Sequence, residues 1–153
     1  MQLRIRRASR GDLPAFLEAY REAYRGLEEY SYSSRRRIKA YLHWLITRDR
    51  DGVFVAEVGE KLAGFICTDS RWISDTGKAV GAVHELVVLP DYRRRGVARR
   101  LMEAGLNYLR EKGCNTVELW VGVKNHSAIR FYESLGFEAG DVVGRWRRML
   151  KTF

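Results

Sequence analysis

Residues 83–98, with the sequence VHELVVLPDYRRRGVA, decide the fold of this chain. An apolar run ends at Pro90, a basic loop containing one glycine, Gly96, follows, and a helical pattern begins at Ala98. This order of strand, tight loop and helix aims several free backbone N–H groups and the positive end of a helix dipole at one point. Such a point binds phosphate oxygens. We therefore predict a pyrophosphate-binding loop over residues 93–98.

Three consecutive arginines support this prediction. Arg93, Arg94 and Arg95 place fixed positive charge in the loop, and guanidinium groups form paired hydrogen bonds with phosphates. A solvated charged turn has the same composition. The loop alone does not distinguish the two interpretations, and a second motif is needed.

That second motif is NHSAIRFYESLGF, residues 125–137. With it, the chain resembles the GNAT superfamily of acetyl-CoA-dependent N-acetyltransferases. The superfamily's loop motif is Gln or Arg, two residues, Gly, one residue, then Gly or Ala, and Arg93, Gly96 and Ala98 match it. The residues that match its second motif are Asn125, Ala128, Tyr132, Gly136 and Phe137. Both motifs stand in the superfamily's order and spacing.

The resemblance implies an α/β fold with a mixed, mostly antiparallel sheet of six to seven strands flanked by four helices. Strands 82–89 and 116–121 would diverge and leave a V-shaped split for the pantetheine arm of acetyl-CoA. The backbone of Leu86, Val87 and Val88 would pair with the pantetheine amides like a short extra strand. The pyrophosphate would rest on the amides of residues 94–98, including Val97, and Asn125 would cap its helix, contact acetyl-CoA, or both.

Glu85 is the second informative residue, because it interrupts a strand that otherwise looks buried. An unpaired carboxylate there is costly, so Glu85 is paired with an arginine, exposed in a cleft, or functional. A cleft carboxylate could take the proton from an acceptor amine, directly or through water. Strand alternation predicts that His84 points to the opposite face, where it is the alternative base or a packed histidine.

Tyr132 lies on the apolar face of its helix, and periodicity alone predicts a core tyrosine. The resemblance instead makes Tyr132 the general acid that protonates the departing CoA thiolate and a contact to acetyl-CoA. The amine would attack the thioester directly, without a covalent enzyme intermediate. A backbone N–H near residues 86–88 would stabilise the resulting oxyanion.

The resemblance implies an acceptor site lined by the first two helices, their connection and the later loops. Acidic and aromatic residues gather in this region: Glu18, Glu22, Glu28, Glu29, Tyr20, Tyr24, Tyr30 and Tyr32. They suit a cationic amine through charge and cation–π contact, although tyrosines at helical spacing are also typical of a core. The acceptor is therefore either a small-molecule amine or a peptide amine. The second motif is similar to that of protein N-terminal acetyltransferases, but it recurs across the superfamily and identifies no substrate.

Composition places the chain among ordinary globular proteins, with one domain over residues 1–153 and no apolar run long enough to span a membrane. Cys67 and Cys114 form neither a disulfide framework nor a metal motif, so we expect no metal and a buried Cys67. Residues 1–7 alternate like a strand and lack the apolar core of a signal peptide, so we expect a cytoplasmic protein. The net charge of +9 raises the alternative of a nucleic-acid-binding domain. Outside the loop we interpret the arginine runs as solvated charge. A non-catalytic acyl-CoA sensor is the other alternative, and the resemblance makes a homodimer possible.

Periodicity and turn residues predict the remaining elements. Asp12 and Ser34 are expected to cap the first two helices. The expected strands are 2–8, 53–58, 61–69, 80–89, 116–121, 137–143 and 145–152. The expected helices run from about residue 13 to 25, from 35, over 95–112 and over 126–135, and residues 71–78 are expected to form a loop that carries Trp72.

Overall fold

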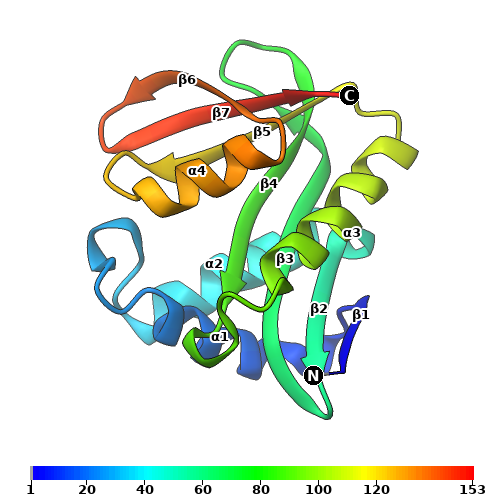
Figure 1. Ribbon diagram of the computed structural model, residues 1–153, viewed down its shortest axis with the longest axis vertical. Coiled ribbons are helices and arrows are strands. Elements are labelled where there is room, and N and C mark those ends of the chain that lie inside the picture. The colour runs from blue at the N-terminus through cyan, green and yellow to red at the C-terminus, as the bar shows by residue number, and fades with distance from the viewer. Residues whose placement is uncertain (1) are drawn as a thin grey trace.

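A computed structural model describes residues 2–153 and shows one seven-stranded sheet in the order β1-β2-β3-β4-β5-β7-β6 (Figure 1). The strands are β1 Leu3–Arg7, β2 Val53–Val58, β3 Lys61–Ile73, β4 Ala79–Val88, β5 Thr116–Gly122, β6 Glu138–Val143 and β7 Trp146–Thr152. The α-helices are α1 Leu13–Ala23, α2 Arg35–Arg48, α3 Val97–Glu111 and α4 His126–Ser134. The predicted fold class, a mixed sheet flanked by four helices, is confirmed within the described residues.

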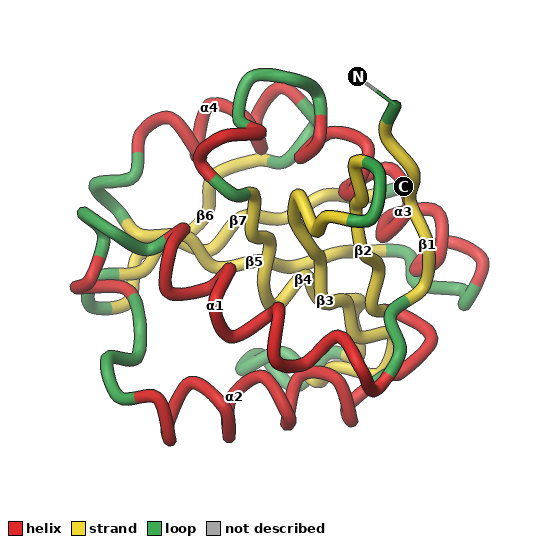
Figure 2. Tube along the Cα trace, turned by 90° about the horizontal axis from the view of Figure 1, so that it is seen from below, coloured by secondary structure: helices red, strands yellow, loops and turns green. Residues whose placement is uncertain are grey.

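The helices cover both faces of the sheet, with α1 and α2 on one face and α3 and α4 on the other (Figure 2). Each face therefore has its own apolar core. On the first face, Phe16 of α1 stacks on Phe65 of β3 with ring centroids 4.0 Å apart. On the second face, Leu101 and Leu109 of α3 are fully buried. Residues 62–67 of β3 and most residues of β4 are apolar, as expected for strands that are covered on both faces.

The sheet splits between β4 and β5. Among the described residues these strands pair in parallel through Gly81–Val83 and Val117–Leu119, whereas every other strand pair is antiparallel. Beyond Val83, β4 continues beside β3, and β5 continues beside β7. The predicted V-shaped split between residues 82–89 and 116–121 is confirmed, although β4 itself ends at Val88.

A β-bulge in β4 changes the direction of one predicted side chain. Cys67 of β3 pairs with Glu85, and the next residue, Thr68, pairs with Val83, so His84 is the extra residue of the bulge. The His84 and Glu85 side chains both lie on the face covered by α1 and α2. Glu85 accepts a hydrogen bond from Tyr41 of α2, and the His84 ring packs against Trp44 of α2. The expectation that they point to opposite faces is wrong, because a bulge breaks the two-residue alternation of a strand.

Two local expectations also need correction. Trp72 lies in β3, which extends to Ile73 because Trp72 pairs with Val80, so the loop is shorter than predicted. Asp12 stands before α1 but makes no side-chain cap, because its carboxylate is held by Arg6 and by the Ser9 backbone.

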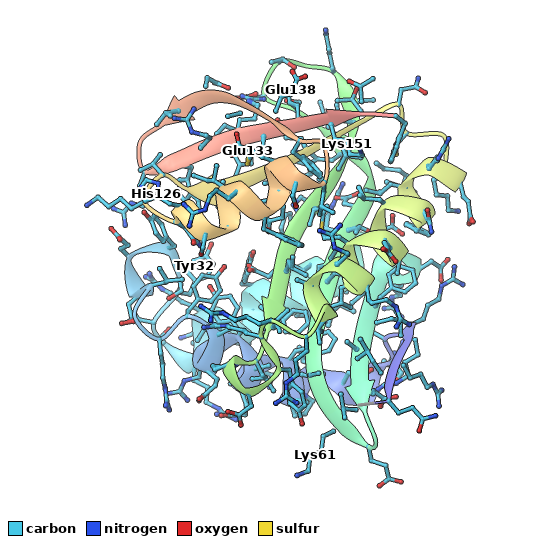
Figure 3. The ribbon with its side chains drawn as sticks, viewed as in Figure 1. Tyr32, Lys61, His126, Glu133, Glu138 and Lys151 are labelled. Carbon is cyan, nitrogen blue, oxygen red and sulfur yellow. The ribbon has the colours of Figure 1, made fainter. Side chains whose placement is uncertain are left out.

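Ser34 does cap α2, since its hydroxyl accepts a hydrogen bond from the backbone N–H of Arg37. Lys61, at the tip of the β2–β3 hairpin, and Glu138, on β6, mark opposite ends of the molecule (Figure 3). Within residues 2–153, no helix combines the length and the apolar character that crossing a membrane requires.

Candidate active site

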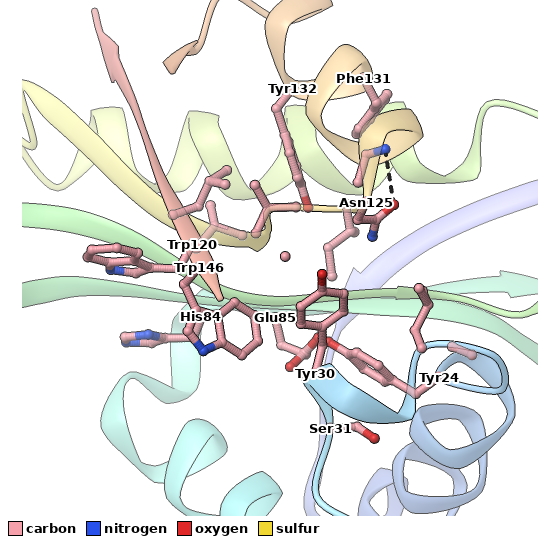
Figure 4. A pocket seen from close by; sticks show the side chains of 18 of the residues that line it. Tyr24, Tyr30, Ser31, His84, Glu85, Trp120, Asn125, Phe131, Tyr132 and Trp146 are labelled. Atoms are coloured by element: carbon pink, nitrogen blue, oxygen red, sulfur yellow. Dashed lines mark hydrogen bonds between the residues drawn. The ribbon is translucent and has the colours of Figure 1, made fainter. Parts of the chain in front are cut away.

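A cleft of about 1160 Å³ lies at the split of the sheet. Its walls come from β4, β5, α4, the start of α3 and the connection between α1 and α2 (Figure 4). Because β4 and β5 separate after Val83, side chains from opposite faces of the sheet open into the same space. This sharing brings together residues that an intact sheet would keep apart.

The predicted phosphate-binding loop forms one end of the cleft. Arg94 and Gly96 both have positive φ, 63° and 79°, and α3 starts immediately afterwards at Val97. A left-handed arginine costs roughly 1–2 kcal/mol, and such strain is found mainly where function demands it. The first helical bond runs from the Arg100 N–H to the Gly96 carbonyl. The N–H groups of residues 97–99 therefore lack acceptors within the helix.

The side chains of this loop have different surroundings. Arg94 and Ala98 line the cleft. The Arg93 guanidinium also lines it while donating a hydrogen bond to the Ala23 carbonyl at the end of α1, over 3.1 Å. Val97 is buried in the core with 1% of its surface exposed, as is Val87 of β4. Those two valines could contact a ligand through their backbone alone.

Glu85 lies at the centre of the cleft with 8% of its surface exposed. The Tyr24 hydroxyl donates to its Oε1 over 2.6 Å, and the Tyr41 hydroxyl donates to its Oε2 over 2.7 Å. Burial raises the pKa of Glu85 to about 7, while hydrogen bonds from the two phenols and from the Leu86 backbone oppose that rise. The expected alternative of an arginine partner is wrong, because tyrosines occupy both oxygens.

Tyr132 points from α4 into the same cleft, opposite Glu85 (Figure 4). Its ring packs edge-on against Phe137, with centroids 5.9 Å apart. Burial, and then the negative charge of Glu85, raise the pKa of Tyr132 above its ordinary value, so the phenol keeps its proton. Asn125 lines the cleft and caps α4 by accepting the Ala128 N–H. The capping role predicted for Asn125 is confirmed.

His84 lies beside Glu85 but has different partners. Its Nε2 is 3.0 Å from Oδ2 of Asp69, and the same oxygen accepts a hydrogen bond from Arg48. Burial raises the pKa of Asp69, but the bonds from His84 and Arg48 outweigh it and hold that pKa below its usual range. The His84 ring also packs against Trp72, with centroids 4.7 Å apart. His84 and Glu85 thus belong to two separate hydrogen-bonded groups.

The connection between α1 and α2 closes the other end of the cleft. Tyr30 reaches the end of β5, where its hydroxyl accepts the Lys124 N–H over 3.1 Å and its ring lies against Gly122. Trp146 of β7 packs on the same tyrosine, with centroids 5.3 Å apart. Arg145 donates to the Glu29 carbonyl over 2.6 Å. These contacts join the two halves of the split sheet.

The structure separates the residues expected around the acceptor. All four predicted tyrosines and one glutamate line the cleft: Tyr20, Tyr24, Tyr30, Tyr32 and Glu29. The other three glutamates contact Arg35, Arg25 and the Gly26 N–H instead; they are Glu18, Glu22 and Glu28. The lining residues that sequence reasoning missed include three large aromatic ones: Tyr41, Trp120 and Trp146. Tyr41 was detectable only as part of the apolar stripe of its helix.

Arg148 contradicts the interpretation of the arginine runs as solvated charge. It is 5% exposed, stacks on Trp120 with its guanidinium carbon 4.6 Å from the ring centroid, and donates hydrogen bonds to Glu118 and Asp75. A buried arginine is tolerated because carboxylates surround it. The arginine fastens the β3–β4 loop to the second half of the sheet.

A mixed sheet with a V-shaped split, a free helix N-terminus at one end of the split and ionisable side chains inside it define the class of acyl-CoA-dependent N-acyltransferases. The chain belongs to the Acetyltransferase (GNAT) family, which matches residues 13–137. The family and the N-acetyltransferase class predicted from the two motifs are therefore confirmed.

Relatives and solved structures agree with this assignment. The chain is 45% identical over 148 residues to an uncharacterized N-acetyltransferase of Methanocaldococcus jannaschii, covering 96% of this chain and 66% of that protein. It is 47% identical over 133 residues to another from Archaeoglobus fulgidus, covering 86% and 90%. A crystal structure of a protein from Pyrococcus horikoshii matches with a TM-score of 0.90 at 36% identity, covering 99% of both chains.

The paia N-acetyltransferase of Thermoplasma acidophilum, solved in complex with coenzyme A, has the same fold, with a TM-score of 0.84 at 24% identity over the full length of both chains. The structure of yncA, a putative acetyltransferase from Salmonella typhimurium with its cofactor acetyl-CoA, matches with a TM-score of 0.76 at 22% identity, covering 99% of this chain and 94% of that one.

Proposed function

We propose that residues 1–153 act as one domain that transfers an acetyl group from acetyl-CoA directly to a primary amine of a small molecule or a peptide. The observation that carries the proposal is the convergence of Glu85 and Tyr132 from opposite faces of the sheet in one cleft. The free N–H groups at the start of α3 lie at one end of that cleft.

Acetyl-CoA binding is assigned to the backbone of the split and of the loop. The backbone of residues 86–88 lies where β5 no longer pairs with β4, so it is available to the pantetheine amides. The amides of residues 94–98, with the charges of Arg93, Arg94 and Arg95 around them, would hold the pyrophosphate. Asn125 lines the same cleft while it caps α4.

Glu85 is proposed as the base. An alkylammonium ion has a pKa of ~10.4, so the acceptor must lose a proton before it attacks. Burial raises the pKa of Glu85 to about 7, which makes its carboxylate a better proton acceptor than an ordinary glutamate near neutral pH. His84 is the alternative base, but its Nε2 already faces Asp69.

Tyr132 is proposed as the acid. A CoA thiol resembles a cysteine, with a pKa of ~8.5, and a proton given to the sulfur as the C–S bond breaks neutralises the departing thiolate. The phenol of Tyr132 keeps its proton in the cleft until then, because burial and the charge of Glu85 oppose ionisation. The acceptor amine gives its proton to Glu85 and Tyr132 gives its own proton to sulfur, and a proton then passes from Glu85 to Tyr132 through water to restore both groups.

The acceptor would bind at the end of the cleft that Tyr30, Trp120 and Trp146 line. Such walls attract cationic amines through their ring faces. Two unpaired cysteines suit a reducing compartment, and we place the enzyme in the cytoplasm on that ground. Association into a homodimer stays a prediction from the family resemblance.

Calorimetric titration with acetyl-CoA at moderate salt, compared with 3′-dephospho-acetyl-CoA, tests the proposal. We expect saturable one-site binding in the micromolar range, about −8 kcal/mol. A thiol-release assay with amines and peptides should then show acetyl-CoA-dependent turnover. Binding without turnover for any acceptor would instead support an acyl-CoA sensor. A folded protein that does not bind acetyl-CoA would rule out both functions, and steeply salt-dependent binding of nucleic acid would then support a nucleic-acid-binding domain.

A further inference from the structure

Both oxygens of the Glu85 carboxylate accept hydrogen bonds from phenols that two different helices supply. Tyr24 follows the last residue of α1, and Tyr41 lies in the middle of α2. Their hydroxyls lie 2.6 Å and 2.7 Å from Oε1 and Oε2. These are short distances for O–H···O bonds and are typical of an ionised acceptor.

This arrangement leaves part of the carboxylate free to accept a proton from a group in the cleft. A carboxylate has about four lone-pair positions, and the two phenols and the Leu86 backbone N–H occupy three of them. The remaining position is available to an amine or a water in the cleft, which Glu85, Tyr24 and Tyr41 all line. Because α1 and α2 pack on each other and on the sheet, the phenols also fix the rotation of the carboxylate.

The choice of phenols decides how strongly the carboxylate holds a proton. An arginine partner would lower the pKa of a glutamate by about 1–3 units and would weaken it as a base at neutral pH. A carboxylate without partners at this depth would be protonated instead. The two phenols and the Leu86 backbone N–H are neutral donors that oppose burial only partly, and the pKa of Glu85 is about 7.

The titratable groups that face Glu85 are all uncharged phenols or thiols. They come from α1, α2, β3 and α4 and are Tyr20, Tyr24, Tyr41, Cys67 and Tyr132. His84, the neighbour on β4, is turned to Asp69, which Arg48 also contacts. Hydrogen bonds from Tyr24 and Tyr41 are therefore the main stabilisation available to the ionised carboxylate.

We infer that Tyr24 and Tyr41 are positioning residues that keep the Glu85 carboxylate ionised and aimed into the cleft, and so set the pH range in which the acceptor amine is deprotonated. The inference rests on the proposed function, because it concerns the base of that reaction. Neither phenol is assigned a contact with acetyl-CoA or with the reacting atoms.

The variants Tyr24→Phe and Tyr41→Phe remove one hydroxyl each and keep the ring. We expect the limb of the kcat/KM profile near pH 7 to move upward by about one pH unit in each variant, because a hydrogen bond to a charged group is lost. Activity should then fall about tenfold at pH 6 and return to within about twofold of the wild type at pH 9.

Tyr108→Phe is the matched control. Tyr108 is also a buried phenol that donates to a carboxylate, Asp49, but it lies on α3 and outside the cleft. Its loss should lower stability without moving the profile. An equal loss of activity at every pH in Tyr24→Phe and Tyr41→Phe would overturn the inference, since a merely structural role predicts that pattern.

A second readout does not depend on turnover. The pKa of Glu85 is measured by 13C NMR of labelled carboxyl groups, with Glu85→Gln identifying the signal. An upward shift in both phenylalanine variants is expected, and an unchanged value would overturn the inference even if the enzyme is active. Failure of the wild type to acetylate any amine would instead count against the proposed function, so the two failures are distinguishable.

Discussion

At the residue scale, Tyr132 holds a phenolic proton beside a buried carboxylate. Its ring is fixed by Phe137 and by the apolar core beneath α4, and its hydroxyl opens into the cleft. A tyrosine that served packing alone could lose its hydroxyl with little effect on the reaction. The hydroxyl is therefore the part of Tyr132 that distinguishes a proton donor from a core residue.

Tyr132→Phe should lower kcat about 10- to 1000-fold, the range typical of lost acid or electrostatic catalysis. The affinity for acetyl-CoA should stay within about twofold, because the ring and the phosphate-binding loop are unchanged. Steady-state kinetics and calorimetry measure the two quantities on the same preparation. Unchanged turnover in this variant would remove Tyr132 from the mechanism.

At the scale of elements, the connection between α1 and α2 joins the two halves of the split sheet. The Tyr30 ring can lie against Gly122 because glycine has no side chain. A Cβ atom at this position would stand 2.3 Å from the Tyr30 Cζ. The Lys124 N–H and Trp146 hold the same tyrosine from the β5–β7 half. The end of the cleft proposed to take the acceptor therefore depends on one glycine.

Gly122→Ala should displace Tyr30 and open this end. We expect a higher KM for the acceptor, little change in acetyl-CoA affinity, and a loss of about 1–3 kcal/mol in unfolding free energy from the overlap. Gly11→Ala is the control, since no atom lies within 4 Å of its added Cβ and its φ is ordinary. An acceptor KM equal to that of the wild type would show that Tyr30 does not shape the acceptor site.

At the scale of the whole molecule, Glu85 links stability to pH. Its pKa is about 7 in the folded protein and ~4.3 in an unfolded chain, so the folded state binds more protons between those values. Stability should therefore fall as the pH rises from ~4.3 to 7 on account of this residue. Asp12 and Asp69 have lowered pKa values, so their contribution is lost as the pH falls below ~4, outside this window.

Glu85→Gln should consequently stabilise the protein at pH 8 by about 3–4 kcal/mol relative to the wild type. The difference should shrink toward zero at pH ~3, below the pKa of Glu85 in both the folded and the unfolded states. Urea unfolding at the two pH values measures this difference. An equal effect at both would show that burial does not oppose ionisation of Glu85.

The amino-acid sequence by itself indicated the family through its two motifs, and the split sheet followed from that resemblance. It also predicted the loop before α3 and the helix that carries Tyr132, because strand, loop and helix signals follow one another within residues 83–98 and 125–137. Local structure of this kind can be predicted from the sequence because capping, φ preferences and periodicity act over a few residues. The capping of α4 by Asn125, three residues before its partner, is an example.

Only the tertiary structure decided the partners of Glu85, the direction of His84 and the burial of Arg148. Tyr24 and Tyr41 stand 61 and 44 residues from Glu85 in the sequence, and no periodic pattern of residues predicts their contact with it. The bulge that turns His84 arises from its pairing with β3, not from its neighbours along the chain. Arg148 can be buried because it pairs with three carboxylates from distant parts of the chain: Glu118, Asp75 and Asp141. Packing between distant elements, rather than local propensity, therefore sets the charge and the direction of the side chains in the cleft.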